Sequence, residues 1–218
     1  MAETTTRFVK ADPYPWPYDG DLRPENTALL VIDMQNDFLL RDAPVGVPAG
    51  LAFVPRIREL ASACRAAGFP VVFTQEMHRA DGSDFGIELE FEPPHCLEGT
   101  RGMELVEGLE PEPGDVLIRG KRRYDAFLGT DLDLALRTRG VENLLVCGVC
   151  TDICVIASVH HARNLDYRVV VLSDLVAGTT RERHQAALTC MEHVFASVSR
   201  TADATPVFGL NLSDPISA

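Results

Sequence analysis

The chain has 218 residues, of which 46% are hydrophobic and 24% are charged, and its formal net charge is −12 at pH 7. This length is enough for one large hydrophobic core, and no Ser/Gly-rich or charged linker divides the chain, so we expect a single α/β domain. Because an acidic surface repels phosphate backbones and anionic lipids, we expect no nucleic-acid partner and no membrane partner.

The compartment is predicted from apolar runs and cysteine usage. No stretch approaches the ~18 consecutive apolar residues that span a membrane. The first residues, MAETTTRFVK, also lack the apolar core of a signal peptide. We therefore expect a cytoplasmic protein whose six cysteines are reduced thiols and not a disulfide framework.

The chain begins with a segment that reads as an extended arm, residues 1–26. Its stretch ADPYPWPYDGDLRPEN holds four prolines and three aromatic residues, which favours extended backbone. The arm could lie over its own domain, reach a neighbouring subunit or line a pocket, and composition does not separate these readings. We expect residues 27–200 to form the folded domain and residues 201–218 a loosely held tail.

Residues 27–74 predict a strand, a helix and a second strand. Thr27–Ile32 is a continuous apolar run, typical of a buried parallel strand. Asp33 follows it and so lies at the carboxyl edge of the sheet, where open α/β folds bind ligands, although a loop-capping role is an alternative. Leu51–Ala67 has one apolar helical face, and Phe69–Thr74 is the second strand.

Polar residues follow the second strand. Glu76 and His78 could form half of a metal site with His95 as a distant third ligand, but a Glu and two separate histidines are a weak signal. We therefore favour ordinary polar pocket residues and expect neither a metal nor another cofactor.

A long excursion and a basic cluster come next. Residues 79–114 are mostly loop, with a short helix expected over 102–109, and such a segment usually forms a lid or a pocket wall. The third strand is predicted at 115–118. Lys121 lies just beyond it within a run of basic residues, which follows a buried strand at the edge that holds Asp33, although a solvated surface patch is the alternative.

The fourth strand leads into a cysteine-bearing helix. Val141–Cys147 is apolar, and after Gly148 the residues Thr151 and Asp152 are good helix N-caps. Cys154 falls in the first turn, where unpaired N–H groups and the helix dipole favour a thiolate and lower the pKa of a thiol.

The rest of the chain completes the predicted sheet. A fifth strand is expected at 167–173, a helix at 181–193 and a short sixth strand at 195–198. His160 and His161 lie too far along the preceding helix to reach Cys154, so we expect them to pack or to contact a partner.

Three strand exits thus carry Asp33, Lys121 and Cys154. Because parallel strands end at a common edge, these residues can converge on one crevice. Their chemistry suits nucleophilic catalysis, with Cys154 as nucleophile, Asp33 as proton acceptor and donor, and Lys121 as the stabilising charge.

The strings VIDMQNDF (31–38), KRRYDAFLGTDL (121–132) and GVCTDICV (148–155) resemble the cysteine hydrolases of the isochorismatase-like superfamily. This group includes nicotinamidases, N-carbamoylsarcosine amidohydrolases and biuret or ureidoacrylate amidohydrolases, and the similarity covers about residues 25–200. The resemblance implies a three-layer α/β/α sandwich around a six-stranded parallel sheet, an Asp33–Lys121–Cys154 triad and a homo-oligomer, either a dimer or a tetramer.

The resemblance also implies details of the site. It places a cis peptide bond at Val149–Cys150, which aims the backbone N–H groups of Cys150 and Cys154 at the developing oxyanion. The arm resembles the leader of biuret-hydrolase-like members, which shifts the expected substrate toward ureido or carbamoyl compounds. The residues that flank the triad in sequence are candidates for the substrate pocket, each with a packing role as its alternative: Phe38, Gln75, His78, Tyr124 and Phe127.

The sequence departs from the family pattern in two places. Cys150 stands where a small residue such as Ala or Thr is usual, and with Cys147 it makes a C-x-x-C. A redox pair would need to lie at a helix start, and zinc would need a second ligand pair, so we favour neither. The Asp-x-His of nicotinamidases is also only partly matched by Glu76-x-His78.

We therefore expect a cysteine-dependent amidohydrolase that cleaves a C–N bond of a small amide, ureido or carbamoyl compound through a thioester and releases ammonia or an amine. Four alternatives are a nicotinamidase-like enzyme, a streptothricin-lactam hydrolase, an isochorismate-type vinyl-ether hydrolase and a non-catalytic interaction module. The presence of Cys154 and of the whole triad argues against the last two.

Overall fold

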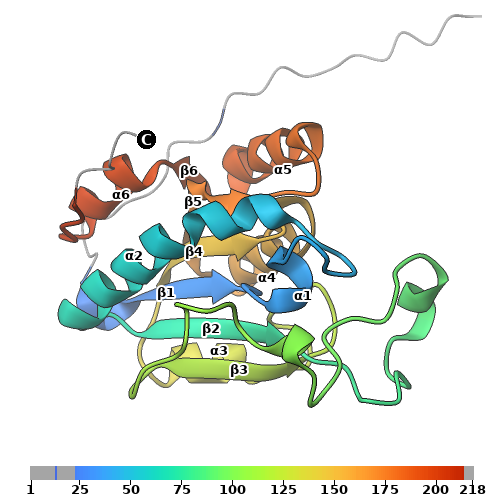
Figure 1. The fold of residues 1–218 in the computed structure, drawn as a ribbon. Helices are drawn as coiled ribbons and strands as arrows, with labels where there is room; N and C mark the ends of the chain where they lie inside the picture. Colours follow the sequence, from blue (N-terminus) through green and yellow to red (C-terminus); the bar gives the residue numbers. More distant parts are fainter. Residues whose placement is uncertain (1–12, 14–22, 214–218) are drawn as a thin grey trace, which may run out of the picture.

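A six-stranded, all-parallel sheet forms the centre of the molecule (Figure 1). The computed structural model describes residue 13 and residues 23–213. The strand order is β3-β2-β1-β4-β5-β6. The strands are β1 (Thr27–Ile32), β2 (Val71–Glu76), β3 (Val116–Lys121), β4 (Asn143–Val149), β5 (Arg168–Ala177) and β6 (Ser197–Ser199).

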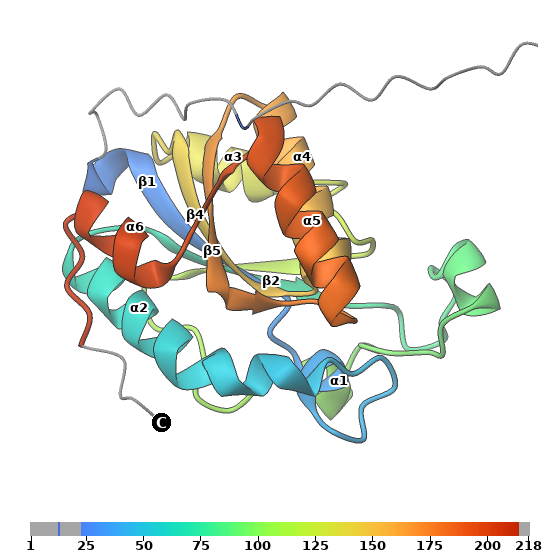
Figure 2. The same ribbon diagram turned by 90° about the horizontal axis from the view of Figure 1, so that it is seen from above.

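Helices cover both faces of the sheet and give three layers (Figure 2). Because side chains alternate along a strand, Leu29 and Val31 of β1 pack into one core and Leu30 and Ile32 into the other. The expected three-layer α/β/α fold is confirmed. One face carries α1 (Asn36–Leu39), α2 (Val54–Ala66) and α6 (Thr201–Val207), and the other carries α3 (Leu132–Arg137), α4 (Ile156–Asn164) and α5 (Arg181–Val194).

Several strands run further toward the carboxyl edge than their apolar runs predict. β3 continues to Lys121 because Arg119 and Lys121 still pair with β2, and β5 continues to Ala177 because Val176 and Ala177 pair with β4 after a shift in register. The helix expected over 102–109 is absent, and only the turn Arg101–Met103 is helical. Leu105 instead forms a β-bridge with Gln35, so this part of the excursion is extended.

The structure tests the prediction for the C-terminal end of the chain but hardly that for the N-terminal end. The C-terminal tail is not loosely held up to residue 213, because α6 packs on β5 and its successors Phe208 and Leu210 are buried in the core. The predicted arm lies almost entirely outside the described residues, and Pro24–Asn26 at its end forms a short 3-10 turn. Within the described ranges, every helix is too short or too polar to cross a bilayer.

Candidate active site

The structure brings Asp33, Lys121 and Cys154 together at the carboxyl edge of the sheet. The Lys121 Nζ lies 2.7 Å from Asp33 Oδ2 and 3.6 Å from Cys154 Sγ. Asp33 follows β1, Lys121 ends β3, and Cys154 lies just after β4, so the ends of three strands of one sheet place them. All three side chains are almost wholly buried.

Asp33 is held by a threonine of the adjacent strand. The Thr74 hydroxyl donates to Asp33 Oδ1 at 2.6 Å and accepts from the Asp33 backbone N–H at 3.1 Å. Burial raises the pKa of the Asp33 carboxyl, and Glu76 raises it further, while Lys121 and Thr74 oppose the rise. A carboxyl with a raised pKa is suited to carry a proton between steps of a reaction.

The Cys154 thiol differs from its sequence prediction in one respect. Its position after the turn is confirmed, but Thr151–Val155 is a π-helical turn and α4 begins only at Ile156. Burial raises the pKa of Cys154 well above that of a free thiol, and Asp33 and Glu76 add to the rise against Lys121. The expected lowering was therefore wrong, because desolvation and two carboxylates outweigh the helix end.

The backbone before Cys154 agrees with what the resemblance implied. The Val149–Cys150 peptide bond is cis. Burial raises the pKa of the Cys150 thiol to about 12. Cys154 Sγ lies 3.6 Å from the ammonium of Lys121, so a Cys154 anion would have a neighbouring positive charge.

Glu76 is a fourth member of this buried group, and the sequence prediction underrated it. Its Oε2 lies 2.6 Å from Lys121 Nζ, so the lysine is shared by Asp33 and Glu76. Burial alone would raise the pKa of Glu76, but Lys121, His78 and His95 hold it well below its usual value. Its place at the exit of β2 was the signal that could have identified it, since β2 lies between β1 and β3.

Cys154 opens onto a cavity of about 220 Å³. Of the predicted pocket residues, Phe38 and Tyr124 line it. Three lining residues that the prediction did not assign to the pocket, Glu88, Glu92 and His95, come from the long excursion. The complete lining is Phe38, Val45, Glu76, Glu88, Glu92, His95, Tyr124, Cys150, Ile153, Cys154 and Thr179.

Gln75 does not line this cavity. Strand alternation points it away from the site to which Thr74 and Glu76 point, and its amide donates to the Met103 carbonyl at 2.6 Å. It borders a separate, wider groove beside residues 98–111.

His78 and Phe127 are also absent from the cavity lining. His78 is fully buried and stacks on Phe85 with ring centroids 3.7 Å apart. Phe127 packs between His161 and Tyr167, with centroids at 5.3 and 5.9 Å. His161 contacts Asp125, which agrees with the packing role expected for it.

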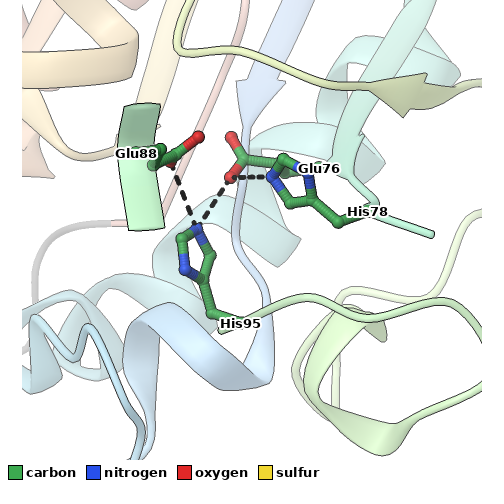
Figure 3. A group of neighbouring side chains, drawn as sticks. All are labelled: Glu76, His78, Glu88 and His95. Atoms are coloured by element: carbon green, nitrogen blue, oxygen red, sulfur yellow. Dashed lines mark hydrogen bonds and ion pairs between the residues drawn. The ribbon is translucent and has the colours of Figure 1, made fainter. Parts of the chain in front are cut away.

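Beside the triad, Glu76, His78, Glu88 and His95 point toward a common centre (Figure 3). One ligand atom from each lies within 4.8 Å of the others. Glu76 Oε1 is 3.0 Å from His95 Nε2 and 3.5 Å from His78 Nε2, and His95 Nε2 is 3.7 Å from Glu88 Oε1. The expectation of no metal rested on a Glu and two separate histidines being a weak signal, whereas the structure brings these three residues and Glu88 together.

The hydrogen bonds around these histidines fit a divalent cation such as zinc. His95 Nδ1 lies 2.8 Å from the Pro93 carbonyl, which fixes the proton there and turns the Nε2 lone pair toward Glu76, another acceptor. A cation between them, or a proton on Nε2, resolves that clash. The contacts with Glu76 and Pro93 raise the pKa of His95 although burial opposes them.

Two buried groups lack partners that a cation would supply. Neither His78 ring nitrogen has a hydrogen bond, and Glu88 Oε2 has none. His78 Nδ1 faces Asp84 Oδ1 at 3.4 Å, which leaves Nε2 for the common centre. Two imidazoles and two carboxylates are a donor set that zinc accepts, so these four residues would hold it.

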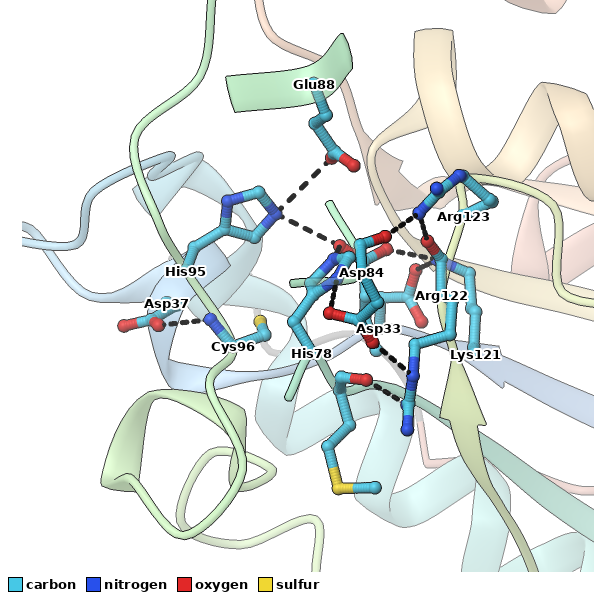
Figure 4. A network of polar contacts seen from close by, with 12 residues as sticks. Asp33, Asp37, His78, Asp84, Glu88, His95, Cys96, Lys121, Arg122 and Arg123 are labelled. Atoms are coloured by element: carbon cyan, nitrogen blue, oxygen red, sulfur yellow. Dashed lines mark hydrogen bonds and ion pairs between the residues drawn. The ribbon is translucent and has the colours of Figure 1, made fainter. Parts of the chain in front are cut away.

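The basic run after β3 anchors the excursion and does not line the cavity (Figure 4). Arg122 Nε pairs with Asp84 Oδ2 at 2.7 Å, and its Nη1 donates to the Met77 carbonyl. Arg123 donates to the Asp84 carbonyl at 2.9 Å. Of the predicted basic cluster, Lys121 therefore belongs to the triad, whereas Arg122 and Arg123 fix the segment that carries the cavity wall.

Comparison with known proteins gives the same family throughout. The isochorismatase domain matches residues 27–203. A probable inactive nicotinamidase of Arabidopsis thaliana is 37% identical, over 78% of this chain and 89% of that protein. A ureidoacrylate amidohydrolase of Pseudomonas syringae is 31% identical, over 86% of this chain and 85% of that protein.

Solved structures agree with these sequence matches. A cysteine hydrolase from Pseudomonas syringae superposes with a TM-score of 0.81 at 27% identity, over 92% of this chain and 99% of that chain. A pyrazinamidase of Pyrococcus horikoshii in complex with zinc superposes with a TM-score of 0.73 at 30% identity, over 80% of this chain and 99% of that chain.

Proposed function

The chain belongs to the isochorismatase family, and from this we propose that it is a cysteine-dependent amidohydrolase that cleaves a C–N bond of a small amide, ureido or carbamoyl compound. The observation that carries the proposal is the buried contact of Cys154 with Lys121, which also pairs with Asp33, at a cavity of small-molecule size. The expected substrate is therefore a small molecule.

In the proposed reaction, Asp33 accepts the proton of the Cys154 thiol as the sulfur attacks the substrate carbonyl. Lys121 stabilises the developing thiolate, and the backbone N–H groups of Cys150 and Cys154 donate to the tetrahedral oxyanion. Asp33 then gives its proton to the leaving nitrogen, so that ammonia or an amine departs and a thioester remains.

The second half of the reaction repeats these roles with water. Asp33 takes a proton from water as the water oxygen attacks the thioester, and the new tetrahedral intermediate expels the Cys154 thiolate. The thiolate recovers its proton from Asp33, and the acid product leaves with the starting state of the site restored.

Replacement of Cys154 tests the proposal. We expect Cys154→Ala and Cys154→Ser to lower ammonia release by more than ~10³-fold, since one member of a catalytic unit is lost. The measurement is an ammonia-release screen against biuret, N-carbamoyl acids, ureidoacrylate, nicotinamide and streptothricin-type lactams, with circular dichroism to show that the variants fold.

Cys150→Ala is the matched control, because its proposed contribution is a backbone N–H and the variant keeps it. We expect it to retain most activity. Full activity in Cys154→Ala would contradict the assignment, and complete loss in a folded Cys150→Ala would mean that the other thiol is the nucleophile.

A second candidate, a nicotinamidase-like enzyme, is favoured by the cluster of Glu76, His78, Glu88 and His95. A zinc ion held there would supply a Lewis acid beside the cavity. His78 and His95 would bind it through Nε2, Asp84 and the Pro93 carbonyl would orient their rings, and Glu76 would also keep its contact with Lys121.

Metal content separates this candidate from a metal-free enzyme. We expect roughly one zinc ion per chain, with loss of the ion and of nicotinamide hydrolysis after chelation. Glu88→Gln should weaken zinc binding, whereas Glu90→Gln, an exposed neighbour on the same turn, should not. If elemental analysis and calorimetry find no zinc binding to the wild type, this candidate is wrong.

A further inference from the structure

The cavity beside the triad has an acidic wall. Glu88 and Glu92 of the excursion line it, and so does Glu76. Among the described residues that line the cavity there is no arginine and no lysine. The nearest ammonium, on Lys121, is already in contact with Asp33 and Glu76.

The balance of charge therefore disfavours an anion in the cavity. Four carboxyl groups, those of Asp33, Glu76, Glu88 and Glu92, surround or line it against the ammonium of Lys121 and the imidazole of His95, which already contacts Glu76 and Glu88. A divalent cation bound by Glu76 and Glu88 would reduce the negative charge without making the site positive. A substrate carboxylate would lose its hydration and find no free cation to replace it.

The aromatic residues of the cavity lining favour a substrate with a positive charge. Phe38 and Tyr124 line the cavity together with the two glutamates. An aromatic face attracts a cation through its quadrupole, and the attraction grows when the site is desolvated. Burial, with the charges of Glu88 and Glu92, raises the pKa of Tyr124 to about 12, so its hydroxyl is neutral and can donate or accept a hydrogen bond.

We propose that the substrates of this enzyme are small amides without a carboxylate, with preference rising from anionic through neutral to cationic compounds, and that Glu92 determines this selectivity. The inference rests on the proposed amidohydrolase function and narrows its substrate class. Ureidoacrylate, named in several relatives, bears a carboxylate and so falls in the disfavoured class.

Three amides of similar size test the charge preference: succinamate, butanamide and 4-aminobutanamide, which are anionic, neutral and cationic at neutral pH. We expect kcat/KM, followed by ammonia release, to be lowest for succinamate and highest for 4-aminobutanamide. The ratio of kcat/KM for 4-aminobutanamide over succinamate should fall as salt is added, because dissolved ions screen the charges of the glutamates that line the cavity.

Variants of the wall assign the effect to Glu92. Glu92→Gln should reduce the ratio of kcat/KM for 4-aminobutanamide over succinamate by roughly ten-fold, as expected for one partly solvated charge several ångströms away. Glu92→Lys should reverse the order. Glu90→Gln removes the same charge from an exposed position of the same segment and should leave the ratio unchanged.

The inference is overturned if the wild type hydrolyses succinamate as well as 4-aminobutanamide, or if Glu92→Gln and Glu90→Gln change the ratio equally. In that case hydrolysis itself would still support the proposed function. Calorimetric binding of the same amides to Cys154→Ala tests the charge preference independently of hydrolysis. Tighter binding of 4-aminobutanamide than of succinamate, with no turnover of any amide by the wild type, would uphold the charge preference and overturn the hydrolase function. Absence of binding as well as turnover would overturn both.

Discussion

Lys121 is the residue at which the charges of the site meet. Its side chain is fully buried and contacts two carboxylates and the Cys154 thiol. Burial lowers the pKa of Lys121, but Asp33, Cys154 and Glu76 raise it well above its usual value, so the ammonium is kept. One ammonium cannot balance three anions in a buried site, so we expect Asp33 and Cys154 to hold one proton between them, in keeping with the raised pKa of each.

This shared proton predicts how activity depends on pH. When Asp33 and Cys154 are both protonated, Asp33 cannot accept the proton of the thiol. We therefore expect kcat/KM to rise as pH increases through the pKa of Asp33, which burial raises above the ordinary value of 3.8. The acid limb of the profile therefore lies at higher pH than that of an ordinary aspartate.

Thr74→Val sharpens the same prediction. The hydrogen bond from the Thr74 hydroxyl lowers the pKa of Asp33. The variant lacks this bond, so its acid limb should lie at still higher pH. A profile of kcat/KM against pH for the two proteins measures this shift. An acid limb at or below the ordinary aspartate value, or one displaced downward in Thr74→Val, would contradict the role of Asp33.

For single residues, the sequence predicts where the site residues lie better than it predicts the burial and charges around them. Asp33, Lys121 and Cys154 could be brought together because each follows a buried strand. The sign of the pKa shift at Cys154 could not be predicted, since desolvation depends on which segments cover the thiol. Glu88 and Glu92 could not be placed because a loop of this length has no periodicity that says which side chains face inward.

Among the elements, the step from β4 into the π-helical turn depends on Gly148. Its φ is +117°, and a Cβ built there would lie 2.1 Å from the Ile32 carbonyl oxygen. Gly148 pairs with Ile32 in the β1–β4 ladder, directly before Asp33. A side chain at this position would therefore push apart the two strands that lead to Cys154 and Asp33.

We expect Gly148→Ala to lower the free energy of unfolding by about 3 kcal/mol or more, because it adds a backbone clash to an unfavourable φ. Gly99→Ala is the control, since Gly99 has a φ of +79° and no atom within 4 Å of an added Cβ, and should cost about 1 kcal/mol. Denaturant unfolding measures both. Equal losses would show that the close approach of β1 and β4 is not what requires a glycine.

Element types followed from the pattern, while their ends depended on tertiary contacts. The run Thr27–Ile32 is apolar after its first residue and predicted β1 to the residue. The polar end of β3 was missed because Arg119 and Lys121 pair with β2, a contact that hydropathy does not encode. The π-helical turn at Thr151–Val155 was likewise missed, because its apolar spacing is compatible with an ordinary helix.

For the molecule as a whole, the alternation of apolar strands and amphipathic helices was enough to predict the parallel sheet and its three layers. The excursion was expected to form a lid or pocket wall, and Glu88, Glu92 and His95 confirm the wall. The homo-oligomer stays a prediction. Ile87 and Phe91 on the same excursion are strongly exposed, at 72% and 64%, and do not line the cavity.

Cys154 and the acidic wall of the cavity come from different kinds of structure. Cys154 and its partners are fixed by neighbouring strands of the sheet, whereas Glu88 and Glu92 belong to one surface segment that the guanidinium groups of Arg122 and Arg123 tie down. Substitutions in that segment leave the strand pairing intact. We expect such an arrangement to allow the lining of the cavity to change by exchange of a short peptide without displacing Asp33, Lys121 or Cys154.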